Sequence, residues 1–237
     1  MSSDVEKNKV TIVTGGAGGL GSELAAEAMK RGRVVIITGR NAGRLTTMAG
    51  VLRERIKSGN VIPFTCDISL QDDIDRLAGF IKSEKYIVEY LINNAGEGYF
   101  GRADKNRSPE VEKILGSNLT GMILLSSSVL SNAGEKHPLT IVNIMSTSAL
   151  LGRATETVYC AAKWGARGFT EALRAELKGT GNKVIAVYPG GMKTSFWDNK
   201  ERDISTFMNP AEVASQIATA VFDAGNIIVS DLTIVRP

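Results

Sequence analysis

The feature that most constrains the fold is the alternation of short apolar runs with longer segments of helical periodicity. The runs are rich in β-branched residues and continuously apolar, as expected of parallel strands covered by helices on both faces. Seven runs occur: "KVTIVT" (9–14), "RVVIIT" (33–38), "NVIPFT" (60–65), "VEYLIN" (88–93), "LTIVNIM" (139–145), "KVIAVY" (183–188) and "NIIVSDLTIV" (226–235). They predict an α/β fold, a doubly wound, seven-stranded parallel sheet with helices on both faces. Ligands of such sheets bind beyond the carboxyl ends of the strands.

Length and composition favour one globular domain over residues 1–237, with its core in 8–237. Hydrophobic residues make up 43% of the chain and charged residues 22%, which argues against disorder and fibrous structure. No repeat, low-complexity tract or proline-rich linker divides the chain. The net charge is +3 and the basic residues are scattered, so neither nucleic acid nor an anionic membrane is an expected partner.

The sequence also argues against secretion, membrane insertion and metal binding. The first ten residues, "MSSDVEKNKV", have mixed charges, and no apolar run approaches the roughly 18 to 20 residues of a membrane span. We therefore expect a soluble, cytoplasmic protein. Cys66 and Cys160 are too few for a disulfide framework, and with His137 they make no metal-ligand pattern. His137 precedes a proline in a polar stretch, where a surface loop is expected.

A glycine-rich segment, "TGGAGGLG" (14–21), follows the first strand and opens a helix. Glycines let the backbone approach a pyrophosphate, which binds well at the positive end of a helix. Two registers fit these letters: G-x-G-x-x-G and T-G-x-x-x-G-x-G. A tight turn needed only for packing is the alternative reading. The position after a first strand favours phosphate binding by Gly15, Gly16, Gly18, Gly19, Leu20 and Gly21.

The end of the second strand favours NADP(H) over NAD(H). An NAD site has an acidic residue about 20 positions after the glycines, which accepts a hydrogen bond from the ribose 2′-hydroxyl. No Asp or Glu occurs between Glu27 and Glu54; Gly39 stands at the expected carboxylate position, and Arg40 follows it. A guanidinium there can pair with a 2′-phosphate, although a solvated arginine at a strand end is the alternative.

Tyr159 and Lys163, in "YCAAK", lie four residues apart and share one face of a predicted helix. A lone pair of this spacing arises readily by chance. A tyrosine is a poor acid and base near neutral pH, and a nearby ammonium favours its phenolate. We therefore expect Lys163 to lower the pKa of Tyr159.

Taken together and in order, these motifs resemble the short-chain dehydrogenase/reductase family over nearly the whole chain. The matching elements are "TGGAGGLG", "CDIS" (66–69), "NNAG" (93–96), "SNLTG" (117–121), Ser146, "YCAAK" (159–163) and "PGGMKT" (189–194). The resemblance implies a Rossmann-type fold and an oxidoreductase that moves a hydride between NADP(H) and a small carbonyl or secondary alcohol substrate.

The resemblance also implies roles for individual residues. Tyr159 would be the general acid/base, Ser146 would hydrogen-bond the substrate oxygen, Asn118 would hold a water that links Lys163 to solvent, and Lys163 would also bind the nicotinamide ribose. Thr147 and Ser148 adjoin Ser146, and only spacing selects among the three. Further cofactor contacts are expected from Asp67, Ile68, Asn93, Ala95, Gly96, Tyr159, Lys163, Pro189, Gly190 and Thr194. Asp67 as a helix cap and "NNAG" as a simple turn are alternative readings.

Substrate choice is expected in 97–102, 149–156 and the polar, irregular segment 195–209, which we expect to be a mobile substrate loop. The aromatic candidates for an apolar pocket are Tyr99, Phe100, Phe196, Trp197 and Phe207, with ordinary core packing as the alternative. The helix after Tyr159 carries an apolar stripe (Gly165, Phe169, Leu173, Leu177) that needs burial, and the helix at about 109–133 is similar. The resemblance implies that these two helices pair between subunits in a homodimer or homotetramer; packing inside one chain is the alternative reading.

A rival from another class is a non-catalytic, NADP(H)-sensing regulatory or scaffold protein on the same fold. Such a protein need not keep the Asn118, Ser146, Tyr159 and Lys163 set. The presence of all four favours an enzyme.

Overall fold

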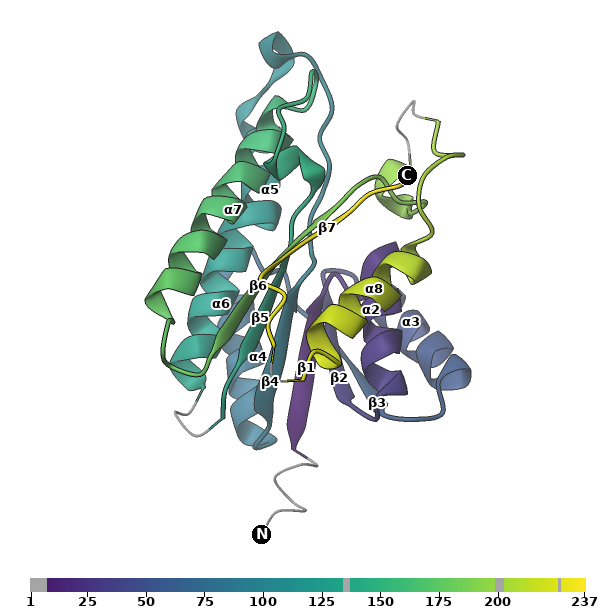
Figure 1. Ribbon diagram of the computed structural model, residues 1–237, viewed down its shortest axis with the longest axis vertical. Coiled ribbons are helices and arrows are strands. Elements are labelled where there is room, and N and C mark those ends of the chain that lie inside the picture. The colour runs from purple at the N-terminus through teal and green to yellow at the C-terminus, as the bar shows by residue number, and fades with distance from the viewer. Residues whose placement is uncertain (1–7, 134–136, 199–202, 226) are drawn as a thin grey trace.

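The predicted parallel sheet is present in the computed structural model, which describes residues 8–133, 137–198, 203–225 and 227–237 (Figure 1). Within these residues seven parallel strands form one sheet in the order β3-β2-β1-β4-β5-β6-β7. The strands are β1 Lys9–Thr14, β2 Val34–Gly39, β3 Asn60–Thr65, β4 Ile87–Asn93, β5 Thr140–Ile144, β6 Lys183–Pro189 and β7 Asp231–Ile234. Only the last is much shorter than predicted. Ile227 and Ile228, which precede it, are exposed, and residue 226 lies outside the described residues.

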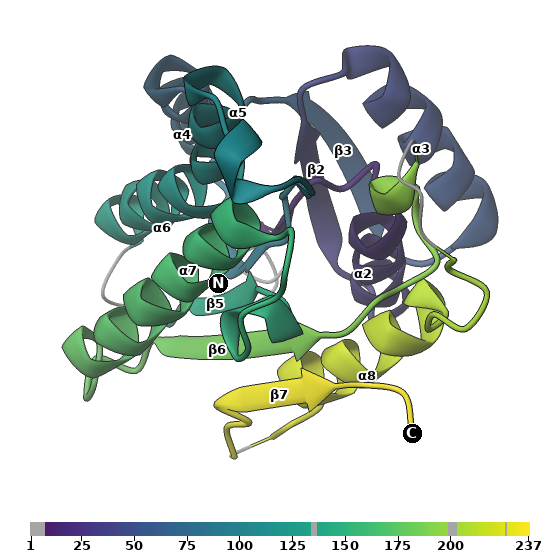
Figure 2. The same cartoon turned by 90° about the horizontal axis from the view of Figure 1, so that it is seen from above.

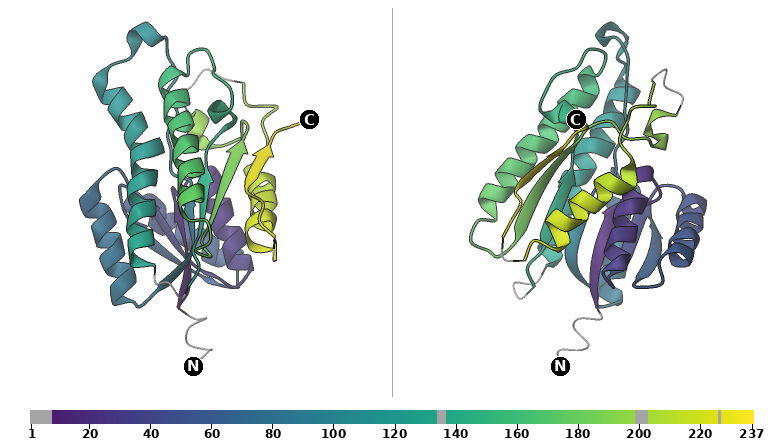
Figure 3. Two further views of the ribbon diagram at one scale, coloured as in Figure 1. Left: turned by 60° about the vertical axis from the view of Figure 1, so that its left-hand side comes forward. Right: turned by 45° about the vertical axis from the view of Figure 1, so that its right-hand side comes forward.

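Helices cover both faces of the sheet (Figures 2 and 3). One face carries α2 Gly19–Lys30, α3 Ala42–Arg55 and α8 Pro210–Phe222; the other carries α4 Gln71–Ser83, α5 Ser108–Leu115, α6 Gly121–Asn132 and α7 Thr157–Glu176. Alternate strand residues serve the two sides: Val13 packs in the core with α2 and α8, and its neighbour Ile12 packs in the core with α4 and α6. Burial on both faces explains why the strands read as continuous apolar runs.

The chain order reverses between β1 and β4, which are neighbours in the sheet. The connection after β1 leads to α2 on one face, and the connection after β4 leads to the helices on the other face. One hydroxyl joins the two connections: Thr14 Oγ1 accepts hydrogen bonds from the backbone N–H groups of Asn94 and Ala95, both at 2.9 Å. The Asn94 side chain donates back to the Thr14 carbonyl oxygen at 2.9 Å. A crevice for a ligand is expected at this point of the sheet.

Buried amides connect the centre of the sheet to the helices beside it. Asn93 Nδ2 donates to Ser126 Oγ on α6 at 3.0 Å and to Asn143 Oδ1 on β5 at 2.9 Å. Asn143 Nδ2 donates to Thr170 Oγ1 on α7 at 2.9 Å. Asn93 is therefore a core residue, and it is absent from the lining of the ligand groove. The Asn93 side chain points into the helix layer, and its neighbour Asn94 lines the groove, so a cofactor contact by Asn93, which stays a prediction, would come from its backbone.

The helix after β4 is continuous from Ser108 to Asn132 and is long and apolar enough, by length and composition, to cross a membrane. This departs from the expectation that no segment approaches a membrane span. The core helix of a soluble protein passes the same test. Met122, Leu125 and Val129 are buried in the protein's own core, which identifies the helix as a core element.

The apolar stripe on α7 also packs within the chain. Phe169 and Leu177 contact the core on the α4 and α6 side, and Leu173 is buried there. A Cβ placed on Gly165 would lie 2.8 Å from Leu119 Cδ2, so the glycine allows α7 to pack closely on the preceding helix. This stripe is thus accounted for without a second subunit.

The buried amide network generates a stability prediction. Asn93→Ala removes the donor to two buried oxygens and leaves a small cavity, so it should lower the free energy of unfolding by about 2–3 kcal/mol. Asn132→Ala is the matched control, because among the described residues this exposed amide bonds only within α6. Its effect should stay within about 0.5 kcal/mol. Urea unfolding of both variants measures the difference. Equal losses would contradict a structural role for Asn93.

Candidate active site

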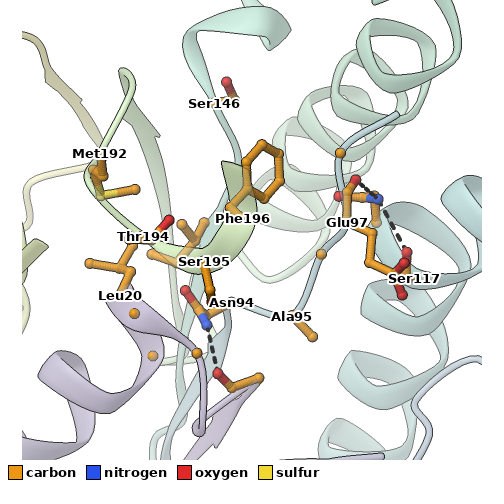
Figure 4. Close-up of a pocket in the computed structure, with 18 of the residues that line it drawn as sticks. Leu20, Asn94, Ala95, Glu97, Ser117, Ser146, Met192, Thr194, Ser195 and Phe196 are labelled. Carbon is orange, nitrogen blue, oxygen red and sulfur yellow. Dashed lines mark hydrogen bonds between the residues drawn. The ribbon is translucent and has the colours of Figure 1, made fainter. Parts of the chain in front are cut away.

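A groove of about 1260 Å³ runs along the carboxyl edge of the sheet. Residues that follow β1, β2, β3, β4, β5 and β6 all line it, so its walls come from parts of the chain far apart in sequence (Figure 4). Of the sequence-predicted site residues, the groove gathers Gly15, Gly18, Gly19, Leu20, Gly21, Arg40, Asp67, Ile68, Ala95, Gly96, Asn118, Ser146, Tyr159, Lys163, Pro189, Gly190 and Thr194. Gly16 and Asn93 are absent from this lining, and so is His137.

The glycine segment follows the T-G-x-x-x-G-x-G register. Gly15 has φ +63°, a conformation that favours glycine. A Cβ on Gly19 would lie 2.5 Å from Thr194 Cγ2, and one on Gly21 would lie 2.3 Å from the Gly15 carbonyl oxygen. Gly16 instead packs on β2, where a Cβ would lie 2.5 Å from Ile37 Cβ. Gly16 therefore packs against β2, and its assignment as a cofactor contact stays a prediction.

The segment fits a phosphate group at the start of α2. The helix begins at Gly19, its N-cap Gly18 offers no side-chain cap, and the first turn carries no acidic residue. The free N–H groups and the positive end of the helix dipole therefore meet the groove with no competing carboxylate in that turn. The backbone of Gly15, Gly18 and Gly19 lines the groove without side chains, and we call these three residues the glycine cradle. Side chains at these positions would occupy the space that a phosphate needs.

Asp67 and Ile68 form the wall that follows β3. Asp67 Oδ1 accepts hydrogen bonds from the Ser69 backbone N–H at 3.0 Å and from the Ser69 hydroxyl at 2.7 Å. The N-cap of α4 is Leu70, so Asp67 shapes a turn and does not cap the helix. Ile68 packs on the start of α6, where a Cβ on Gly121 would lie 2.6 Å from Ile68 Cγ1.

Arg40 lies beside Glu97, an acidic residue that was not predicted to contact the cofactor. Its guanidinium forms an ion pair with the Glu97 carboxylate, and the Lys113 ammonium forms a second pair with the same carboxylate at 2.7 Å. The three residues come from the end of β2, the segment after β4, and α5. Arg40 is therefore positioned at the groove, but it is already paired with an acid.

Tyr159 and Lys163 lie on the first two turns of α7 with their side chains buried. Lys163 Nζ is 5.7 Å from the centroid of the Tyr159 ring and donates to the Ile144 carbonyl oxygen at 3.3 Å. The Ser146 side chain lies within hydrogen-bonding reach of the Tyr159 hydroxyl.

Ser146, the residue that spacing favours, adjoins the tyrosine, and its two hydroxyl neighbours bond elsewhere. Thr147 Oγ1 accepts from Arg153 at 3.1 Å, and Ser148 Oγ donates to Glu156 at 3.0 Å.

Burial decides the protonation of this pair. Loss of hydration raises the pKa of Tyr159 above its ordinary value; the hydrogen bond with Ser146 opposes this rise, and the negative charge of Glu156 adds to it. Burial also lowers the pKa of Lys163 to about 8. The prediction that Lys163 makes this phenol acidic is therefore wrong for the protein alone. Desolvation penalises both charged forms, so it favours a neutral phenol beside an amine that titrates near pH 8.

Asn118 lies where the long helix is interrupted by a π-helical turn, Gly116–Thr120. Such turns occur often at functional sites. Asn118 Nδ2 donates to the carbonyl oxygens of Glu97 at 2.9 Å and Ile114 at 3.0 Å. Its buried Oδ1 has no hydrogen-bond partner among the described residues. A Cβ on Gly96 would lie 2.5 Å from this oxygen and 3.5 Å from Lys163 Nζ, so Oδ1 and the amine border the same space.

Aromatic rings form the wall beside Tyr159. The Tyr159 ring centroid is 5.9 Å from that of Phe196 and 6.3 Å from that of Phe100, and Trp197 lies 5.2 Å from both Phe100 and Phe207. In Figure 4, Phe196 lies between Ser146 and Glu97.

Tyr99 is the exception among the predicted pocket aromatics: it packs on Ile114, Val158 and Ala162, away from the groove lining. Most of the predicted substrate loop, 195–209, is described as irregular chain after a 3₁₀ turn at Ser195–Trp197, and residues 199–202 lie outside the described residues.

Four side chains of this groove have no individual role predicted from the sequence: Lys113, Asn94 of "NNAG", and Glu97 and the buried Glu156 of the expected substrate segments. Asn94 belongs to the "NNAG" motif and Glu97 directly follows it, but the directions of their side chains depend on where β4 ends. Lys113 carries no sequence signal beyond an ordinary helix-surface lysine. Glu156 directly precedes α7, and only the fold reveals its burial.

The chain is similar to known dehydrogenases over most of its length. The family model described as short chain dehydrogenase matches residues 9–205. A curated relative, 2-(S)-hydroxypropyl-CoM dehydrogenase 3 of Xanthobacter autotrophicus, is 32% identical over 188 residues, which is 78% of this chain and 71% of that protein.

Two solved structures are also similar. A short-chain dehydrogenase/reductase from Vibrio parahaemolyticus is 33% identical, with a TM-score of 0.82 over 96% of each chain. A variant of actinorhodin polyketide ketoreductase with NADPH is 28% identical, with a TM-score of 0.86 over 97% of this chain and 96% of that one.

The burial of Lys163 generates a pH prediction. Its pKa is about 8 in the folded protein against an ordinary value of 10.5. The unfolded chain therefore binds more protons between these values, so this residue makes the free energy of unfolding rise with pH across that window, by up to about 3 kcal/mol. Below pH 8 both states are protonated, and the cost of burying the charge is fully present.

Lys163→Met should remove this rise. The melting temperature of the natural protein, measured relative to that of the variant at each pH, should increase by several degrees between pH 7.5 and 10. If the melting temperatures of the two proteins changed with pH in parallel, the pKa of Lys163 would be near its ordinary value and this prediction would be wrong.

Proposed function

This chain belongs to the short-chain dehydrogenase/reductase family, and we propose that it is an NADP(H)-dependent oxidoreductase acting on a carbonyl or secondary alcohol substrate. One observation carries the proposal: the Ser146 and Tyr159 hydroxyls, the Lys163 amine and the orphaned Asn118 Oδ1 meet at one end of a groove whose other parts include a glycine cradle at a helix N-terminus. A proton donor, an oxygen-binding hydroxyl and a phosphate cradle in one groove suit carbonyl reduction.

The residues fit a nicotinamide dinucleotide along the groove. Gly15, Gly18 and Gly19 would receive the pyrophosphate, and Asp67 and Ile68 would flank the adenine. Lys163 would bind the nicotinamide ribose, and Thr194, with Pro189 and Gly190, would line the nicotinamide end.

The choice of NADP(H) over NAD(H) is supported by Arg40 and by Gly39 at the place of the acidic residue. The similar ketoreductase structure with NADPH agrees with it.

When bound, the dinucleotide supplies or accepts the hydride at the substrate carbon. The chain itself handles the oxygen: Ser146 donates a hydrogen bond to it, and Tyr159 gives it a proton in reduction. Because burial keeps the phenol protonated, Tyr159 is ready as an acid. Lys163 and a water held by Asn118 Oδ1 would return the proton from solvent.

The aromatic wall favours substrates with an apolar, flat portion next to the carbonyl. Rings of Phe100, Phe196 and Trp197 stand beside Tyr159, where such a portion gains both area burial and ring contacts. We further propose that the protein works in the cytoplasm as a homodimer or homotetramer.

The role of the tyrosine hydroxyl gives one prediction. Tyr159→Phe should lower turnover of any active carbonyl compound by at least about 10²-fold, because the proton donor is lost, while the affinity for NADPH stays within about threefold. Tyr86→Phe is the matched control and should keep full turnover, because Tyr86 lies at the amino-terminal end of β4, away from the groove at the carboxyl ends of the strands. NADPH oxidation followed by absorbance measures turnover, and NADPH fluorescence measures binding. Undiminished turnover in Tyr159→Phe would refute its role; silence of the natural protein across a broad carbonyl panel would favour the non-catalytic sensor.

The cofactor choice gives another prediction. With one carbonyl substrate and matched concentrations, kcat/KM for NADPH should exceed that for NADH by about tenfold or more, the scale of a charge-assisted hydrogen bond to phosphate. Arg40→Ala should reduce the advantage while leaving kcat/KM for NADH nearly unchanged. A preference for NADH in the natural protein would overturn the NADP(H) assignment.

A further inference from the structure

We propose that Arg40 and Lys113 form a two-cation site for the 2′-phosphate of the cofactor, and that Glu97 occupies this site as an internal competitor until the phosphate displaces it. The inference rests on the proposed use of NADP(H) and extends it. It adds two specificity-determining residues, Lys113 and Glu97, to the one that the sequence suggests.

The geometry brings three elements to one point of the groove. Arg40 follows β2, Glu97 follows β4, and Lys113 lies on α5. Both cations pair with the same carboxylate, at 2.7 Å for Lys113 Nζ. All three residues line the groove that holds the glycine cradle. Two cations that contact one carboxylate are close enough together to contact one phosphate.

The backbone at Glu97 is held by a hydrogen bond from a buried amide, whereas its carboxylate is held by the ion pairs with Arg40 and Lys113. The Glu97 carbonyl oxygen accepts from Asn118 Nδ2 at 2.9 Å, an amide buried in the π-helical turn. Figure 4 shows Glu97 beside Ser117 on this wall of the groove. In the proposed exchange, the Glu97 side chain rotates away from both cations while this backbone hydrogen bond stays in place.

Charge and exposure indicate that the exchange favours phosphate. The Arg40 and Lys113 side chains are 53% and 58% exposed, and that of Glu97 is 26% exposed. Exposed pairs of this kind each change an equilibrium by less than about fivefold. A phosphomonoester carries about 1.5 to 2 negative charges at pH 7 against one for the carboxylate, and a guanidinium can bind it through two parallel hydrogen bonds.

The carboxylate also has a consequence for NADH. A dinucleotide without the 2′-phosphate brings no charge that replaces Glu97, so the two ion pairs stay as they are. Removing the charge of Glu97 should therefore increase the affinity for an adenosine ribose that carries a 2′-phosphate. The affinity for a ribose without this phosphate should stay nearly unchanged.

The test uses two fragments that carry only the adenosine end, 2′,5′-ADP and 5′-AMP, titrated calorimetrically into the full chain. Glu97→Gln keeps the size of the side chain and removes its charge. It should tighten binding of 2′,5′-ADP by about three- to twentyfold and change binding of 5′-AMP by less than twofold. Adding Lys113→Gln to this variant should remove most of the gain.

Glu110→Gln is the matched control, because it makes the same change in net charge on α5 outside the groove lining. The inference is overturned if Glu97→Gln tightens 2′,5′-ADP no more than Glu110→Gln does, or if it tightens 5′-AMP equally. If the natural protein favours 2′,5′-ADP and Glu97→Gln leaves that preference unchanged, this inference fails and the NADP(H) proposal stands. If neither protein favours 2′,5′-ADP, both fail.

Discussion

The pairing of β1 with β4 is the constraint on which the rest of the structure depends. Because of this pairing, the connections that follow β1 and β4 lie next to each other and run to opposite faces of the sheet. A crevice opens between them. Thr14 joins the two through its hydroxyl and its carbonyl oxygen. Without this contact the glycine cradle and the segment that carries Ala95, Gly96 and Glu97 would not face one groove.

The groove has two electrostatic environments, and each suits the part of the ligand proposed for it. Around Tyr159 and Lys163 burial is nearly complete, and loss of hydration raises the pKa of the phenol and lowers the pKa of the amine. Around Arg40, Glu97 and Lys113 the charges are partly exposed, paired and exchangeable. In the proposed function, proton transfer would take place in the buried part, where a donor keeps its proton, and phosphate recognition would take place in the partly exposed part.

The sequence predicts the fold and much of the site because both depend on local patterns. Continuous apolar runs come from strands buried on both faces, and the glycines before α2 come from backbone that must lie close to other atoms. What it could not predict depends on side-chain direction and burial. Asn93 and Asn94 are the same type of residue, yet the Asn93 side chain forms hydrogen bonds in the core and the Asn94 side chain forms its hydrogen bond at the groove. The pKa of Tyr159 follows from desolvation that a helical spacing does not reveal, and the pairing of Arg40 with Glu97 joins residues 57 positions apart in the chain.

A crystal structure of the protein with NADP⁺ tests the central claim most directly, that one groove binds the dinucleotide with its nicotinamide beside the buried hydroxyls. The account predicts the nicotinamide ring within contact of the Tyr159 and Ser146 hydroxyls and the adenosine ribose near Arg40. A dinucleotide bound in the reverse direction, or a Tyr159 hydroxyl that faces away from the nicotinamide, would contradict it.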